Sequence, residues 1–202
     1  MIYNFFYRSL QNLINLFLSK KKFLYQITNY LNENSYSEIH EIGCSDGILV
    51  SGLNLKNSKY FGYDIDSINL NKAKKKFKNY KNIYFYLKSI DHINIKNNNK
   101  KKIFIFSGVF HHLNDCQISK FLRVISSKDH IIGIDPFFHK KINIIGYLMK
   151  KFDKGQFIRT EKNYKKVLRN FKFSKKINYY LKFYSHLISY RNIDKSIIKK
   201  YF

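Results

Sequence analysis

A short glycine-containing stretch, Glu-Ile-Gly-Cys-Ser-Asp-Gly at residues 41–47, directly follows a hydrophobic run. Glycine in a loop between a strand and a helix lets the backbone approach a ligand closely, and the helix N-terminus offers unpaired N–H groups. The stretch differs from the GxGxxG dinucleotide fingerprint, because Ser45 stands where the middle glycine would be. By itself, the stretch indicates a ligand-binding loop without identifying the ligand.

A carboxylate at the end of the next hydrophobic run makes the ligand more specific. The run Tyr-Phe-Gly-Tyr-Asp ends at Asp64, which lies 21 residues after Gly43. An acidic side chain at the tip of a second strand accepts hydrogen bonds from the hydroxyls of a ribose. The alternative is that Asp64 caps the following helix, although Asp66 or Ser67 is better placed for that role. The two signals together predict a cofactor that contains a ribose.

Two adjacent histidines, His111 and His112, follow a later hydrophobic run. Histidine exchanges protons near neutral pH, so either one is a candidate general base; the alternative is that one packs inward and caps the next turn. Asp135, just before Pro136, is a candidate contact to the acceptor substrate or a structural carboxylate. Adjacent histidines lack the i,i+4 spacing of a helical zinc pair, so we expect no metal site.

The elements that must position these residues alternate between strand and helix. The predicted strands are 37–42, 59–64, 82–86, 102–107 and 130–135. The predicted helices between them are 48–55, 67–78 and 115–126. We expect Pro136 to break the fifth strand. This alternation indicates an α/β fold with a parallel sheet and right-handed crossovers, which brings the carboxyl ends of the strands to one edge.

The two ends of the chain differ from this central pattern. Apolar spacing predicts amphipathic helices at 4–18 and 21–33, which either cover the edge of the core or form a lid or membrane-surface helix. The later predicted elements are helices at 142–152 and 161–170, followed by an antiparallel strand pair at 177–183 and 186–190. We therefore predict a single domain. It has an N-terminal helical cap at 1–36, a cofactor-binding core at 37–136, and acceptor-side helices and C-terminal strands at 137–192.

Taken together, these motifs resemble those of class I S-adenosylmethionine-dependent methyltransferases, in register from about residue 38 to 190. EIGCSDG resembles the first motif, (D/E)xGxGxG, and GYDIDSINLNKA at 62–73 resembles the segment around the ribose-binding acid. IFIFSGVFHHLND at 103–115 and IIGIDPF at 131–137 resemble the ends of the fourth and fifth strands. The resemblance implies a Rossmann-like fold with a mostly parallel seven-stranded sheet, helices on both faces and S-adenosyl-L-methionine as the cofactor.

The resemblance also implies roles for individual residues. Glu41 would orient the glycine loop and contact the methionine part of the cofactor, and Asp64 would hold the ribose hydroxyls. Ile65 and Ile90 would neighbour the adenine, with Ser89 standing where many members have an aspartate. The remaining expected cofactor contacts are Gly43, Cys44, Ser45, Gly47 and Ser107.

The tail resembles a narrower group of small bacterial methyltransferases, the HHL subgroup of types 11 and 12, whose members often lie near cell-surface polysaccharide or glycolipid genes. The similarity covers 153–171 and 184–190. It implies that Arg159 meets an acidic or phosphate-bearing acceptor. The alternative is that Arg159 forms an ion pair with Asp153 or Glu161, because surface arginines commonly pair.

The net charge of +25 has two interpretations. Such an excess is typical of proteins that bind nucleic acid or an anionic membrane surface. However, only five of the 38 basic residues are Arg, and Lys, Asn, Ile, Phe and Tyr, which share A/T-rich codons, are all abundant, so nucleotide bias explains the composition without a partner. The two cysteines form no disulfide framework, and the first residues lack a signal-peptide pattern, so we expect a cytoplasmic protein.

The sequence therefore predicts a methyltransferase that acts on a small-molecule acceptor. We expect oxygen-directed transfer to a sugar, a glycolipid or a lipid-linked intermediate. One alternative is an RNA methyltransferase that uses the lysine excess, although aromatic and arginine residues are not gathered in one place. A second alternative is a non-catalytic protein that binds the cofactor and acts through a partner.

Overall fold

The structure is a computed structural model, and it describes residues 20–96, 98–138, 155–176 and 185–202. Its strands are β1 (Glu38–Ile42), β2 (Lys59–Asp64), β3 (Ile83–Leu87), β4 (Lys102–Ser107), β5 (His130–Phe138), β6 (Arg159–Thr160), β7 (Lys172–Lys176) and β8 (Ser185–Arg191). Its α-helices are α2 (Lys20–Glu33), α3 (Ser67–Lys76), α4 (Asp115–Val124), α6 (Glu161–Val167) and α7 (Lys195–Tyr201). Three short 3₁₀ turns are η1 (Val50–Gly52), η2 (Ile90–His92) and η3 (Phe110–His112).

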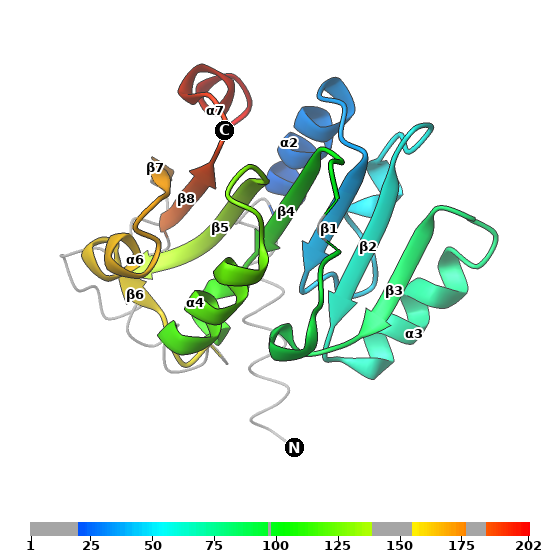
Figure 1. The fold of residues 1–202 in the computed structure, drawn as a ribbon, viewed down its shortest axis with the longest axis horizontal. Coiled ribbons are helices and arrows are strands. Elements are labelled where there is room, and N and C mark those ends of the chain that lie inside the picture. Colours follow the sequence, from blue (N-terminus) through cyan, green and yellow to red (C-terminus); the bar gives the residue numbers. More distant parts are fainter. Residues whose placement is uncertain (1–19, 97, 139–154, 177–184) are drawn as a thin grey trace.

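These strands form one sheet in the order β3-β2-β1-β4-β5-β8-β7 (Figure 1). Strands β1 to β5 pair in parallel, and β8 runs antiparallel to both β5 and β7. The predicted Rossmann-like sheet with an antiparallel C-terminal pair is therefore confirmed. The two-residue β6, which pairs with the end of β5, is an addition to the seven strands expected.

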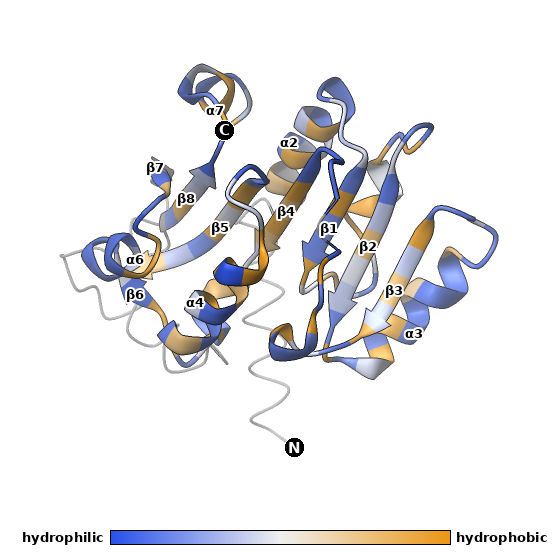
Figure 2. Cartoon of the chain, in the orientation of Figure 1, coloured by the Kyte–Doolittle hydropathy of each residue, from blue (hydrophilic) through white to orange (hydrophobic). Residues whose placement is uncertain are grey.

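The central strand β4 explains why the sheet is covered on both faces. Its residues Ile103 to Phe106 have no exposed surface, and Figure 2 shows the apolar colouring that runs along this strand. A continuous apolar run is typical of a parallel strand buried from both sides. Burying each such side chain stabilises the fold by roughly 2 kcal/mol, so β4 is a principal source of core stability.

Alternate residues of the strands pack in two separate hydrophobic cores, one on each face of the sheet. On one face Ile103 and Ile105 pack in a cluster with residues of α2, α3 and α7. On the other face Phe104 and Phe106 pack in a cluster with residues of α4 and α6. Helices therefore lie on both faces of the sheet, as the alternation of strand and helix predicts.

The parallel register brings the predicted site residues to one edge. Ile42 at the end of β1 pairs with Tyr63 on β2 and Phe106 on β4, and Ser107 pairs with Ile134 on β5. The residues that follow these positions, from the glycine loop to Asp135, consequently share the carboxyl edge. The order of the strands reverses between β1 and β4, where ligands bind in sheets of this type.

The helix predicted at 48–55 is wrong. The chain there makes turns and the single 3₁₀ turn η1. The Ser51 hydroxyl donates to the Gly47 and Ile48 carbonyls, and the Asn32 side chain on α2 bonds to the backbone of Gly52 and Asn54. β-Branched residues, serine and glycine have low helix propensity, so these side-chain hydrogen bonds stabilise the turns more than a helix would be stabilised. Within the described residues, no α-helix begins directly after the glycine loop.

Pro136 does not break β5, contrary to expectation. The strand continues to Phe138, and Pro136 pairs in register with His186 of β8. On its other flank β4 has already ended opposite Ile134, and β6 begins opposite Phe137. Proline is tolerated where one side of a strand requires no ladder N–H, and the end of β4 supplies such a position.

The C-terminal pair also starts earlier than expected. Its first strand is β7 at Lys172–Lys176, whereas the predicted strand 177–183 lies outside the described residues, as do the helices predicted at 4–18 and 142–152. The predicted helices at 21–33 and 161–170 appear as α2 and α6. Helix α7, which was not predicted, packs against α2 through the Lys200–Glu33 ion pair.

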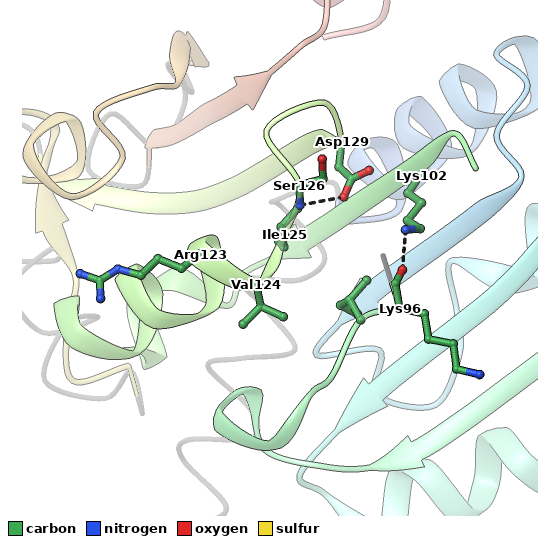
Figure 3. A pocket seen from close by; sticks show the side chains of 8 residues that line it. Lys96, Lys102, Arg123, Val124, Ile125, Ser126 and Asp129 are labelled. Atoms are coloured by element: carbon green, nitrogen blue, oxygen red, sulfur yellow. Dashed lines mark hydrogen bonds between the residues drawn. The ribbon is translucent and has the colours of Figure 1, made fainter. Parts of the chain in front are cut away.

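The opposite edge of the sheet contains a cavity of about 140 Å³, drawn in Figure 3. Lys102 and Asp129, at the amino ends of β4 and β5, are buried beside it. The Lys102 ammonium donates to the Lys96 carbonyl at 2.7 Å, and Asp129 accepts from the Ser126 backbone at 3.1 Å. Because the predicted site residues lie at the carboxyl edge, this cavity is separate from them.

Candidate active site

The glycine loop, residues 43–47, turns sharply after β1. Gly43, Ser45 and Gly47 all have positive φ values, of 76°, 49° and 76°. The Gly43 and Cys44 amides both donate to the Tyr63 carbonyl, at 2.8 and 3.1 Å, and the Gly47 amide donates to the Cys44 carbonyl. The loop is therefore tied to the end of β2, which brings it beside Asp64.

Two of the glycines are required by close contacts as well as by backbone conformation. A Cβ on Gly43 would lie 2.6 Å from Val109, and one on Gly47 would lie 3.0 Å from Phe77. The first distance is shorter than real Cβ contacts, and the second is tighter than most of them, so the loop packs directly against the turn after β4 and the end of α3. Glycine is thus needed at both ends of the loop.

Ser45 is strained, because a residue with a Cβ in the left-handed region costs about 1 kcal/mol. We expect Ser45→Gly to stabilise the protein by about 0.5 kcal/mol, the relieved strain being partly offset by the greater freedom of glycine in the unfolded chain. A urea titration would show this as a higher midpoint. Ser45→Ala is the matched control, because it keeps the Cβ and should not raise the midpoint; equal midpoints for the Gly and Ala variants would contradict the strain.

Asp64 lies at the tip of β2 and is half-buried. One carboxylate oxygen accepts from the Ser45 amide at 2.7 Å, and the other accepts from the Asp66 amide at 2.8 Å. A carboxylate has about four acceptor positions, so two remain for ligand hydroxyls. The N-cap of α3 is Asp66, which accepts from the Ile68 and Asn69 amides. The alternative that Asp64 caps this helix is therefore excluded.

Glu41 and Cys44 lie beneath the loop, and both are buried. The Tyr60 hydroxyl donates to Glu41, and burial followed by the Glu41 charge raises the pKa of Tyr60. Burial first, and then the carboxylates of Glu41, Asp64 and Asp46, raise the pKa of the Cys44 thiol. Cys44 is therefore a neutral, unreactive thiol at physiological pH, surrounded by three carboxylates.

Asp46 is a candidate site residue that sequence reasoning missed. One of its carboxylate oxygens is buried and has no hydrogen-bond partner among the described residues. A buried polar atom without a partner is costly in the absence of a ligand. The available signal was an acidic residue inside the glycine loop. Together with Glu41 and Asp64, it gives this part of a strongly basic chain a local negative charge that suits a cationic ligand.

The residues expected near the adenine have different exposures. Ile65 follows Asp64 and is 76% exposed, so an apolar ring has a free aliphatic side chain to pack on. Ile90 is buried in the core cluster of the α4 face. The Ser89 hydroxyl donates to Asp91 at 3.4 Å, and Asp91 also accepts from Gln117 at 2.8 Å. Asp91 thus supplies a carboxylate two residues beyond the position where Ser89 replaces the usual acid.

The tip of β4 leads into a turn that carries the histidines. Ser107 is half-buried, and the Gly108 amide donates to the Ile134 carbonyl at 2.8 Å. A Cβ on Gly108 would lie 3.5 Å from Cε1 of His111, so the imidazole edge of His111 lies over this glycine. His111 is therefore beside the segment where the methionine part of the cofactor is expected.

The structure brings His111 and Asp135 together. One Asp135 oxygen lies 2.8 Å from Nδ1 of His111 and also accepts from the His111 amide at 3.2 Å. Both residues are buried; burial raises the pKa of Asp135, and the hydrogen bond and charge of His111 oppose that rise. The second Asp135 oxygen is buried without a hydrogen-bond partner among the described residues. The carboxylate fixes the orientation of the imidazole ring.

His112 and Arg159 occupy very different environments. The His112 residue is exposed, and its ring centroid lies 4.1 Å from that of His111. Arg159 is 6% exposed and forms an ion pair with Asp115 at 2.6 Å. Of the two partners in the alternative expectation, Glu161 pairs with Lys165, and Asp153 lies outside the described residues. The position of Arg159 does not favour a contact with the acceptor.

No described helix combines the length and apolar character that crossing a bilayer requires. No group of three His, Cys, Asp or Glu side chains within that part of the chain has an arrangement suited to a metal ion.

Comparisons with known proteins identify a domain match and structures with the same fold. Residues 39–128 match the family model described as a methyltransferase domain, whereas no curated protein matches the chain significantly. The N-methyltransferase NodS from Bradyrhizobium japonicum has a TM-score of 0.63 and 13% identity, covering 89% of this chain and 98% of that chain. The plantazolicin methyltransferase BamL, crystallised with a triazolic substrate analog and SAH, has a TM-score of 0.62 and 13% identity, covering 95% and 90%.

A third structure, the mitomycin 7-O-methyltransferase MmcR, has a TM-score of 0.65 and 10% identity, covering 93% of this chain and 56% of that chain. At such identities the solved structures establish the fold, and the family match adds the methyltransferase class. The narrower subgroup indicated by the tail stays a prediction. The chain therefore matches a methyltransferase domain over residues 39–128 and has the fold of these solved methyltransferases.

Proposed function

We propose that this enzyme methylates a hydroxyl group of a small-molecule acceptor, and that the His111–Asp135 pair receives the hydroxyl proton. The observation that carries the proposal is the 2.8 Å contact between Nδ1 of His111 and Asp135, beside the Ser107–Gly108 turn. A ring held in this way presents Nε2 as the proton acceptor, by the same logic as in other histidine–carboxylate pairs. The acceptor class we favour is a sugar, a glycolipid or a lipid-linked intermediate.

The residues of the carboxyl edge fit the cofactor. Asp64 retains two acceptor positions for ribose hydroxyls, and Ile65 offers an apolar surface for adenine. S-adenosylmethionine, when bound, supplies an activated methyl group on a positively charged sulfur. The carboxylates of Glu41, Asp46 and Asp64, which together raise the pKa of Cys44, favour a ligand of that charge. The unpartnered Asp46 oxygen is a candidate acceptor for its ammonium group.

This arrangement supports separate roles for the cofactor-binding residues and the histidine pair. The glycine loop and Asp64 bind and orient the cofactor, so that positioning supplies much of the rate acceleration. Asp135 holds the Nδ1 edge of His111, and we assign the transfer of the acceptor proton to the Nε2 edge. Both cysteines are free thiols, which suits the reducing cytoplasmic compartment that the proposal assumes.

RNA methylation is the competing function, and the local charge argues against it. The described carboxyl edge carries Glu41, Asp46, Asp64 and Asp135, which repel a polyanion, while Arg159 is held inside the protein. The buried histidine–carboxylate pair at this edge favours catalysis over a non-catalytic role.

Transfer of a labelled methyl group from S-adenosylmethionine to a panel of sugars, lipid-linked glycans and RNA tests the proposal. We expect label in a small-molecule acceptor, and His111→Gln should lower that transfer at least 100-fold while cofactor affinity stays within about twofold. His130→Gln is the matched control, since His130 bonds to Tyr36 far from this edge. Label found only in RNA, or undiminished transfer in His111→Gln, would contradict the proposal.

A further inference from the structure

Arg159 lies on the short strand that pairs with the end of β5. Its strand β6 lies beside Phe137, and its guanidinium reaches across to the turn formed by η3, residues 110–113. This turn carries both histidines. Tyr164 on α6 lies against the guanidinium, with its ring centroid 5.7 Å from Cζ of Arg159. The side chain therefore connects the C-terminal part of the sheet to the turn after β4.

The hydrogen bonds of Arg159 account for every donor that a guanidinium has. Nε and Nη2 both donate to one carboxylate oxygen of Asp115, at 2.9 and 2.6 Å. Nη1 donates to the Phe110 and Phe157 carbonyls at 2.8 and 3.0 Å, and Nη2 also donates to the Leu113 carbonyl at 2.7 Å. The five N–H groups thus make five hydrogen bonds to four acceptor atoms within the protein, so none remains for an acceptor phosphate or carboxylate.

These acceptors lie immediately on either side of the two histidines. The Phe110 and Leu113 carbonyls flank His111 and His112, and the His111 carbonyl accepts from the Phe157 amide at 2.9 Å. From the other side, Asp135 holds both the amide and the ring of His111. The turn is therefore held between the tip of β5 and the segment at 157–159.

We propose that Arg159 is a positioning residue, which acts through the 110–113 turn to keep His111 aligned with Asp135. The inference rests on the proposed function, because it assigns Arg159 to the proton-accepting pair of that site. It replaces the expectation that Arg159 binds the acceptor. Lysine cannot substitute for it, since an ammonium has three donors, no planar fork and a single nitrogen to reach carbonyls on both sides of the histidines.

Nuclear magnetic resonance of ¹⁵N-labelled histidine tests the proposal without requiring the acceptor. In the wild type we expect the His111 ring to carry its proton on Nδ1. In Arg159→Lys we expect a mixture of Nδ1 and Nε2 protonation, while calorimetry shows the affinity for S-adenosylmethionine within about twofold of the wild type. Once an acceptor is identified, kcat should fall roughly tenfold or more with little change in the KM for the cofactor.

Two further variants keep the test decisive. Arg191→Lys is the matched control, because Arg191 is half-buried and bonds to the Ser126 carbonyl at the opposite edge, so its loss should lower stability without moving the His111 proton. Asp115→Asn should shift the His111 tautomer in the same direction as Arg159→Lys but less, and it serves if the arginine variant does not fold.

Different results contradict the positioning role of Arg159 and the proposed function of the His111–Asp135 pair. If the His111 tautomer is unchanged in both Arg159→Lys and Asp115→Asn, the positioning role is overturned even though the His111–Asp135 pair stands. If wild-type His111 lacks the Nδ1 proton, the pair itself and the proposed function are contradicted.

Discussion

Asp64→Ala is expected to weaken the binding of S-adenosylmethionine by roughly 100-fold. Each hydrogen bond to a charged carboxylate contributes about 1.5–3 kcal/mol, and two ribose hydroxyls lose their acceptor. The substitution also removes the acceptor for the Ser45 amide, which lies 2.7 Å from Asp64 and helps to hold the glycine loop. Isothermal titration calorimetry on the wild type and the variant measures the change directly.

Asp66→Ala is the matched control for this experiment. Asp66 lies two residues further on and caps α3, so its loss should cost about 1 kcal/mol of stability without removing a ligand contact. We expect the affinity of this variant to stay near that of the wild type. If both variants lose affinity equally, Asp64 acts only through local structure and not through the ribose.

The second large effect is a loss of stability in acid that His40 causes. The His40 ring lies between the rings of Phe61 and Phe104, with both centroid distances 4.7 Å. Burial lowers the pKa of His40 from 6.5 to about 4; Glu38 opposes this change, and the positive charge of Lys102 adds to it. Between these two values the unfolded chain binds a proton that the folded protein does not.

Stability therefore rises with pH across this window, and it falls as the pH is lowered from 6.5 towards 4. The full effect is about 3 kcal/mol, since each unit of pKa shift corresponds to about 1.4 kcal/mol. His40→Phe should remove this part of the pH dependence, because phenylalanine fits the same aromatic stack without titrating. Urea unfolding at a series of pH values measures it, and parallel stability curves for the two proteins would contradict the assignment.

The strands followed from patterns that act locally. The run at 102–107 reads as a buried strand from its own residues, and Asp64 is placed by the end of the strand before it. The 48–55 segment failed because its conformation depends on Asn32, which lies on a helix distant in sequence. Pro136 was misjudged for the same reason, since its tolerance depends on where β4 ends.

The site residues show the same limit. Residue type and spacing identify the glycine loop and the histidines as candidates, and the structure places them at one edge. The partners of Arg159 are 44 to 49 residues away for Asp115, Leu113 and Phe110, so no local pattern reveals that its donors are all used. The unpartnered oxygen of Asp46 is likewise a property of packing, which composition and spacing do not contain.

The most direct test of the account is a calorimetric titration of the wild-type protein with S-adenosylmethionine. We predict saturable binding of a single cofactor per chain with a micromolar Kd, and a loss of affinity when the ribose hydroxyls are removed from the ligand. A sample that unfolds cooperatively, and is therefore folded, but gives no binding heat at any temperature tested would contradict the assignment of the loop at 43–47 and of Asp64 to a cofactor site.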